Sequence, residues 1–302
     1  MTTPQENQLS DKDARLWTAL LVLVALIWGN AFVAIKVIVA HVTPLAFITV
    51  RFVPVALTFA LLLLPIRRRE MWLMIRSEWW RLGLLGLLGG VAYNGFLAWG
   101  ETRIAAGTAS LIIALNPAFT YLLSVLFMGE RLTWQRSLGI AIAFAGLFVI
   151  IRWGSGQAVT LEDAKYAFIT LLAPLCWAAY TVIGKGVVSR HPPLLVTGVA
   201  MSVAGMVSLL FVTPSLLAQL PTLPGSFWWS LAFLVFLCTV FAFVIWFGAL
   251  EKMPAGRVAS FIYLVPLFAN TFSLLMLGER ITAPSVAGGI VLVGGVWLVN
   301  RR

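Results

Sequence analysis

Apolar runs of about 20 residues, the length that crosses a bilayer, follow one another along nearly the whole chain. Of the 302 residues, 61% are hydrophobic and only 11% are charged, whereas a soluble domain carries about a quarter charged residues. In lipid, the backbone polar groups of each run must be satisfied within the run, and a helix does this. The sequence therefore predicts an all-α polytopic membrane protein.

The predicted transmembrane helices number ten, joined by short connections. They cover residues 16–40, 44–65, 82–100, 104–128, 134–152, 164–188, 194–216, 226–249, 255–278 and 284–300. Residues 1–15 are polar and form a predicted cytoplasmic tail. The first apolar run is about 25 residues long, which is too long for the core of a secretory signal, so we count it as the first helix.

The basic residues indicate how the chain is oriented. The formal net charge is +10, but Lys and Arg lie mainly in the connections, and no nucleic-acid motif accompanies them. With the N-terminus inside, fourteen basic residues fall in cytoplasmic segments, and only Arg103, Arg152, Lys165 and Arg280 fall outside. Because Lys and Arg are retained on the cytoplasmic side, we expect an inner-membrane (plasma-membrane) protein with both termini in the cytoplasm.

An internal repeat divides the chain at an offset of 149 residues. Residues 26–36 align with residues 175–185, and residues 111–133 align without a gap with residues 260–282, with ten identities in 23 positions. The two halves, 16–153 and 164–302, hold five predicted helices each. Because five is odd, the second half is inverted, and two inverted five-helix repeats are a transporter architecture with a substrate site between the halves.

Several motifs make the chain resemble a known family. They are Trp28-Gly-Asn, Asn116-Pro117 and the two Gly-Glu-Arg-x-Thr segments that begin at Gly129 and Gly278. The chain resembles the EamA type of the drug/metabolite transporter superfamily, most of all its bacterial exporters of amino acids, aromatic ones in particular. This resemblance implies ten helices and the export of neutral metabolites.

Polar and aromatic residues inside the apolar runs are the candidates for substrate binding. Asn in a membrane helix usually faces the bundle interior, and Tyr and Trp suit an aromatic or apolar ligand. The alternative is that they pack between helices. The candidates are Trp28, Asn30, Tyr93, Asn94, Asn116, Trp177, Tyr180 and Tyr263.

Pro117 and Pro266 occupy equivalent positions in the two halves. A proline inside a helix frees the carbonyl four residues earlier, here that of Ile113 or Ile262. We interpret both prolines as kinks beside a cavity, whose freed carbonyls could accept an ammonium group. A kink for shape alone is the alternative.

Three basic residues, Lys36, Arg51 and Lys185, lie within predicted helices. An ionisable group inside a membrane is a functional hypothesis by default. Lys36 and Lys185 are close enough to helix ends to reach the outer and inner interfaces, whereas Arg51 lies deeper and could bind a substrate carboxylate or a backbone carbonyl. Glu130 and Glu279 are predicted to close the two membrane faces.

All eleven acidic residues and both histidines fall in termini, connections or helix ends. A proton-coupled carrier typically uses an Asp, Glu or His inside the membrane, so we expect facilitated diffusion, with a proton-coupled exporter or a passive channel as alternatives. An enzyme would need a base or metal ligands beside a nucleophile, and Cys176 and Cys238 lack metal-ligand spacing. No catalytic residue, metal or cofactor is expected; the expected partners are a small-molecule substrate, the lipid bilayer and a candidate second copy of the chain, but no nucleic acid.

Overall fold

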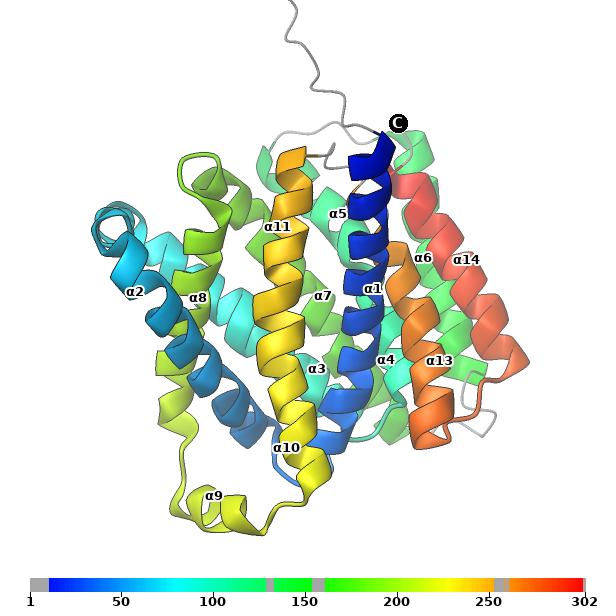
Figure 1. Ribbon diagram of the computed structural model, residues 1–302. Coiled ribbons are helices and arrows are strands. Elements are labelled where there is room, and N and C mark those ends of the chain that lie inside the picture. Colours follow the sequence, from blue (N-terminus) through cyan, green and yellow to red (C-terminus); the bar gives the residue numbers. More distant parts are fainter. Residues whose placement is uncertain (1–10, 129–132, 154–160, 253–257, 259–260, 301–302) are drawn as a thin grey trace, which may run out of the picture.

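The computed structural model describes residues 11–128, 133–153, 161–252, 258 and 261–300, and these residues form a bundle of helices without a strand (Figure 1). The first half begins with α1 (Asp11–Val39) and α2 (Pro44–Leu85), followed by the π-helix η1 (Gly86–Ala92) and α3 (Tyr93–Glu101). It ends with α4 (Ala106–Ile113), α5 (Asn116–Met128) and α6 (Trp134–Trp153).

The second half is divided differently, because the stretch equivalent to the continuous α2 is split there into α8 (Pro193–Ser208), the short α9 (Pro214–Gln219) and α10 (Gly225–Ala232). These three helices follow α7 (Leu161–Val188), and the π-helix η4 (Phe233–Phe241) and α11 (Ala242–Lys252) come after them. The 3-10 turn η5 (Phe261–Leu264), α13 (Val265–Leu277) and α14 (Ala283–Asn300) complete this half.

The helices match the ten predicted membrane crossings, with different boundaries. In the described residues, seven continuous helical segments are long and apolar enough to cross a membrane, and two shorter apolar ones cover residues 261–277 and 283–299. The longest segment, Pro44–Glu101, contains two predicted crossings. Large apolar side chains such as Phe127 and Ile290 lie exposed on the outside, as expected where lipid replaces water.

The connection at residues 66–81, expected as a loop, is helical. Only Arg67 and Glu78 depart from helical backbone angles there, so α2 turns twice instead of ending. Glu78 is buried and accepts hydrogen bonds from Arg81 on its own helix and from Arg190 after α7, at 2.7 Å each. This charge-assisted contact attaches residues 66–81, which we call the α2 extension, to the second half of the chain.

The two halves pack on each other through equivalent elements. The repeat mates α6 and α14 form one pair, and the mates α2 and α8 form another. The contact of α1 with α13 is matched by that of α7 with α5. Even the two π-helices fall at equivalent positions, since η1 is displaced by 149 residues onto η4. The fold is therefore that of two inverted five-helix repeats about a pseudo-two-fold axis.

Candidate functional site

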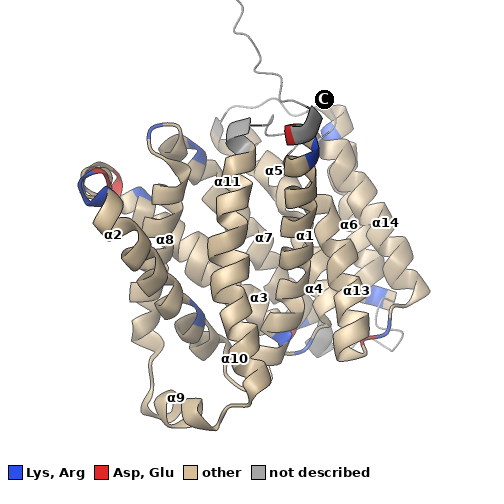
Figure 2. Cartoon of the chain, viewed as in Figure 1, with Lys and Arg blue, Asp and Glu red and all other residues tan. Residues whose placement is uncertain are grey.

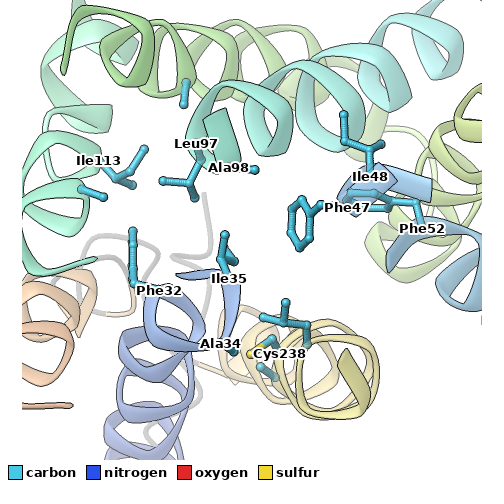
Figure 3. Packing of buried hydrophobic residues seen from close by; sticks show 14 of the residues in the cluster. Phe32, Ala34, Ile35, Phe47, Ile48, Phe52, Leu97, Ala98, Ile113 and Cys238 are labelled. Carbon is cyan, nitrogen blue, oxygen red and sulfur yellow. The ribbon is translucent and has the colours of Figure 1, made fainter. Parts of the chain in front are cut away.

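A cavity of about 150 Å³ lies between the two halves. An apolar cavity of this size can bind a benzene ring. Figure 3 shows part of its apolar surroundings, with Phe32 and Ile35 of α1 facing Leu97 of α3 and Ile113 of α4. The wall consists of Trp28, Ala31, Phe32, Ile35, Arg51, Phe52, Gly89, Tyr93, Asn94, Leu97, Ile113, Asn116, Trp177, Met201, Cys238, Thr239, Phe243, Ile262 and Val265.

Most of this wall consists of pairs of residues that are 149 positions apart. The six pairs are Trp28 with Trp177, Phe52 with Met201, Gly89 with Cys238, Asn94 with Phe243, Ile113 with Ile262 and Asn116 with Val265. A cavity lined by equivalent residues of both halves lies on the pseudo-two-fold axis that relates them. This is where an inverted-repeat transporter holds its substrate.

The two sides of the cavity differ in polarity although their backbones are equivalent. Asn94 and Asn116 of the first half correspond to Phe243 and Val265 of the second. Arg51, also in the wall, has Ala200 as its equivalent. The first half thus supplies a polar side with one positive charge, and the second half supplies an apolar side, so the cavity suits a ligand with a polar head and an apolar body.

Arg51 is held in place by a chain of hydrogen bonds that begins at the π-helix η1. The side-chain amide of Asn94 donates to the carbonyls of Gly89 and Gly90, at 3.0 and 2.9 Å. The carbonyl oxygen of Asn94 accepts from Arg51 Nη1 at 2.9 Å. The buried Nε of Arg51 has no hydrogen-bond partner among the described residues, so the guanidinium keeps a free donor.

The second π-helix, η4, positions Trp28. The indole Nε1 of Trp28 donates to the carbonyl of Cys238 at 3.1 Å. The ring packs against Trp246, with 5.1 Å between centroids, and against Phe243 at 6.0 Å. A π-helix leaves backbone groups outside the regular α-helical pattern and is frequent at functional sites. Each of the two π-helices thus supplies a main-chain carbonyl that holds a side chain of the cavity wall, Asn94 at η1 and Trp28 at η4.

Three further aromatic side chains, from α3 and α7, pack against one another in a row. Tyr93 lies 5.0 Å from Trp177, and Trp177 lies 5.1 Å from Tyr180, measured between ring centroids. Tyr93 and Trp177 line the cavity, whereas Tyr180 supports Trp177 from behind and packs on Gly89. These rings give the cavity flat apolar surfaces from α3 and α7.

The helices that carry Pro117 and Pro266 are interrupted just before each proline. The first changes from α4 to α5 at Ala114 and Leu115, and the second changes from η5 to α13 after Leu264. Each proline then occupies the second position of the new helix, where its missing N–H is not needed. Ile113 and Ile262 precede the two breaks and both line the cavity, as does Asn116, whose buried Oδ1 has no partner among the described residues.

A group of charged residues lies one helical turn beyond the cavity, at the end of the bundle where α1 and α3 end. Lys36 Nζ donates to the carbonyls of Glu101 and Ile104, at 2.6 and 2.7 Å. The carboxylate of Glu279 accepts from the amides of Ala106 and Gly107, at 2.9 and 3.3 Å. Glu279 therefore satisfies the N-terminus of α4 and joins the two halves.

Glu101 lies at a helix end, as the sequence analysis places it, but inside the protein. It is the last residue of α3, and it is completely buried. Both carboxylate oxygens lack a hydrogen-bond partner among the described residues. Glu101 therefore joins the partly buried Lys36 and Arg51 as an ionisable group inside the bundle. The reason is tertiary, since Lys36, Glu279 and α4 cover the end of α3.

Other predicted site residues lie away from the cavity. Asn30 is on α1 but not in the cavity wall, and its buried Oδ1 has no partner among the described residues. Tyr263 and Pro266 line a separate groove between α13 and α14. Lys185 is exposed in the last turn of α7, and Glu130 falls outside the described residues.

The sequence analysis did not select the apolar part of the wall, including Phe52, Met201, Cys238 and Phe243. The internal repeat is a signal that could have found some of it, because the 149-residue offset applied to Asn94 and Asn116 leads to Phe243 and Val265. No group of His, Cys, Asp and Glu that could hold a metal ion occurs among the described residues.

Comparisons with known proteins agree with this architecture. The model of the EamA-like transporter family matches residues 15–152 and again residues 164–301. A "Probable terminal-alkyne amino-acid exporter" of Streptantibioticus cattleyicolor is 33% identical over 93% of this chain and 92% of its own length. A "Probable amino-acid metabolite efflux pump" of Salmonella typhimurium is 28% identical over 92% of this chain and 93% of its own length.

Two further comparisons concern an archaeal relative and the fold. An uncharacterized transporter of Archaeoglobus fulgidus is 31% identical over 93% of this chain and 98% of its own length. A solved crystal structure superposes with a TM-score of 0.60 over 96% of both chains, at 20% sequence identity, which shows a shared fold. Because the family model matches both halves of the chain, the protein belongs to the EamA-like transporter family and is a multi-pass membrane transporter.

Proposed function

We propose that the protein exports small neutral metabolites, above all amino acids with aromatic or large apolar side chains. The unequal polarity of the cavity carries this proposal. A free amino acid has a zwitterionic head and one side chain, and the cavity offers Arg51, Asn94 and Asn116 on one side and apolar residues on the other. The names of two relatives, an amino-acid exporter and an amino-acid metabolite efflux pump, point to the same substrate class.

In the proposed complex each part of the substrate has a partner. The carboxylate accepts from the free Nε of Arg51, and the ammonium donates to Asn116 Oδ1, both of which lack partners in the described residues. The side chain lies among Trp28, Trp177 and Phe243. These contacts satisfy buried polar groups that otherwise cost free energy.

The proposed mechanism is alternating access by facilitated diffusion. The two halves exchange conformations, so that the cavity opens first to one side and then to the other. Among the described residues, the cavity wall contains no carboxylate and no histidine, which supports movement of the substrate down its own gradient rather than exchange for a proton in the cavity.

Counter-flow in proteoliposomes tests this function. Unlabelled phenylalanine inside the vesicles should accelerate the uptake of radiolabelled phenylalanine, because a carrier returns faster when it is loaded. A passive channel gives no such acceleration. Absence of counter-flow with every aromatic and large apolar amino acid would refute the proposed substrate class.

The aromatic row gives the first prediction about individual residues. Trp177→Ala and Tyr93→Ala should each lower phenylalanine counter-flow about 2- to 10-fold, because an aromatic contact contributes about 0.5–1.5 kcal/mol beyond its buried area. Trp229→Ala removes a ring that is 80% exposed on the outside and should leave the rate unchanged. If the yield of folded protein fell in parallel with the rate, the rings would be packing residues.

The orientation, with both termini in the cytoplasm of a bacterium, is part of the proposal. Figure 2 shows Lys and Arg gathered mainly at the end of the bundle where α1 begins, and basic residues favour the cytoplasm. Ser215→Cys, exposed on α9, should react with an impermeant maleimide added to intact cells, and Ser77→Cys, exposed on the α2 extension, should react only after lysis. The reverse pattern would invert the orientation.

A further inference from the structure

Glu101 is a buried carboxyl group that has no role in the transport cycle proposed above. It is completely buried, and neither of its oxygens has a hydrogen-bond donor among the described residues. Burying a carboxylate without donors costs far more than burying the neutral acid. The closed arrangement around Glu101 is therefore much better suited to the protonated form.

The neighbouring charges act on Glu101 in opposite directions. Lys36 of α1, Glu279 after α13 and, more weakly, Arg51 of α2 act electrostatically on Glu101. The positive charges of Lys36 and Arg51 attract a carboxylate at Glu101, and the negative charge of Glu279 repels it. The ammonium of Lys36 donates to the main-chain carbonyls of Glu101 and Ile104, so it leaves both carboxyl oxygens of Glu101 without a donor. The uncharged hydroxyl of Tyr93 belongs to the same helix, α4 has no charged residue, and α7 places the hydroxyl of Thr170 beside Gly100.

The same residues hold one end of the cavity closed. Leu97 in the cavity wall lies one helical turn before Glu101 on α3. Beyond it, Lys36 joins α1 to the α3–α4 connection, and Glu279 joins the second half to α4. For the cavity to open at this end these elements must separate, and water would then reach Glu101.

We propose that Glu101 is a proton-binding site that controls closure of the cavity at this end. The open form releases the proton to the solution on that side, and closure takes one proton from that solution onto the carboxylate. Raising the pH therefore favours the open form, and the ratio of closed to open molecules changes by up to about tenfold per pH unit. The inference rests on the alternating access proposed above but not on the identity of the substrate.

The rate at which a cavity thiol is labelled measures this equilibrium without any substrate. In a Cys176→Ala chain, Cys238 in the cavity wall is the remaining cysteine. An impermeant maleimide is added on the side that labels Ser215→Cys. That side is the one where Lys36 lies, because Gln219 at the end of α9 donates to the carbonyl of His41, just after α1.

Comparison with Glu101→Gln, which stays neutral, isolates the proposed proton because thiol ionisation is common to both chains. The labelling rate of the parent chain should rise with pH more steeply than that of Glu101→Gln, by up to about tenfold per pH unit. Glu70→Gln, which changes a half-exposed carboxylate that binds Arg67, should behave like the parent. Equal pH slopes for the parent and for Glu101→Gln would overturn the proposal.

Two further variants keep the test decisive. Glu101→Asp retains a titratable group and should retain the steep pH dependence if Glu101→Gln does not fold. Met201→Cys in a chain without either native cysteine replaces the reporter if Cys238 does not react. Because no amino acid is present, these results stand or fall independently of phenylalanine counter-flow.

Discussion

Arg51→Gln is expected to lower phenylalanine counter-flow roughly 10- to 100-fold, because a hydrogen bond to a charged group contributes about 1.5–3 kcal/mol. Glutamine can still donate to Asn94, but it removes the positive charge and the free Nε that we assign to the substrate carboxylate. Arg51→Lys retains the positive charge but lacks the planar guanidinium group. Its rate should therefore lie between those of the parent protein and Arg51→Gln.

Substrate selectivity separates a binding role of Arg51 from a structural one. The parent protein should prefer phenylalanine to phenethylamine, which lacks the carboxylate, in a competition assay. Arg51→Gln should lose this preference. Trp177→Ala should lower the affinity for both compounds but retain the preference for phenylalanine. A variant that transports slowly but still discriminates would show that Arg51 supports the fold and does not bind the carboxylate.

The fold could be predicted because both features that determine it can be recognised in the sequence alone. Apolar runs of membrane length predict helices, and the 149-residue offset predicts an inverted duplication; both predictions are confirmed. The boundaries were less predictable. Residues 66–81 contain Arg and Glu, which suggest a loop, but they continue as helix because Glu78 is buried against Arg81 and Arg190.

The candidate site could be predicted only where a residue differs in type from its surroundings. Trp28, Tyr93 and Trp177 stand out in apolar helices, and all three line the cavity. Phe52 and Met201 do not stand out, because a helix that is apolar on every side gives no sign of which face meets lipid and which meets the cavity. Burial of Glu101 depends on Lys36 and Glu279, which are distant in sequence, so no local pattern could reveal it.

The contact between α6 and α14 gives the largest expected change in stability. These helices meet backbone to backbone through Gly139 and Gly146 on α6 and their repeat mates Gly288 and Gly295 on α14. Close approach at small residues is how membrane helices gain packing energy. A Cβ atom on Gly295 would overlap the amide nitrogen of Ala143 and lie 2.6 Å from the carbonyl oxygen of Gly139.

Gly295→Ala should therefore destabilise the protein by about 1–3 kcal/mol, the usual cost of an extra methyl group in a well-packed contact. Its sequence neighbour Gly294 provides the matched control, because a Cβ there meets nothing within 4 Å. Gly294→Ala should leave stability unchanged or raise it by up to about 1 kcal/mol through helix propensity. Thermal unfolding of both variants in the same detergent compares two identical substitutions one residue apart, and equal melting temperatures would show that α6 and α14 do not meet at Gly295.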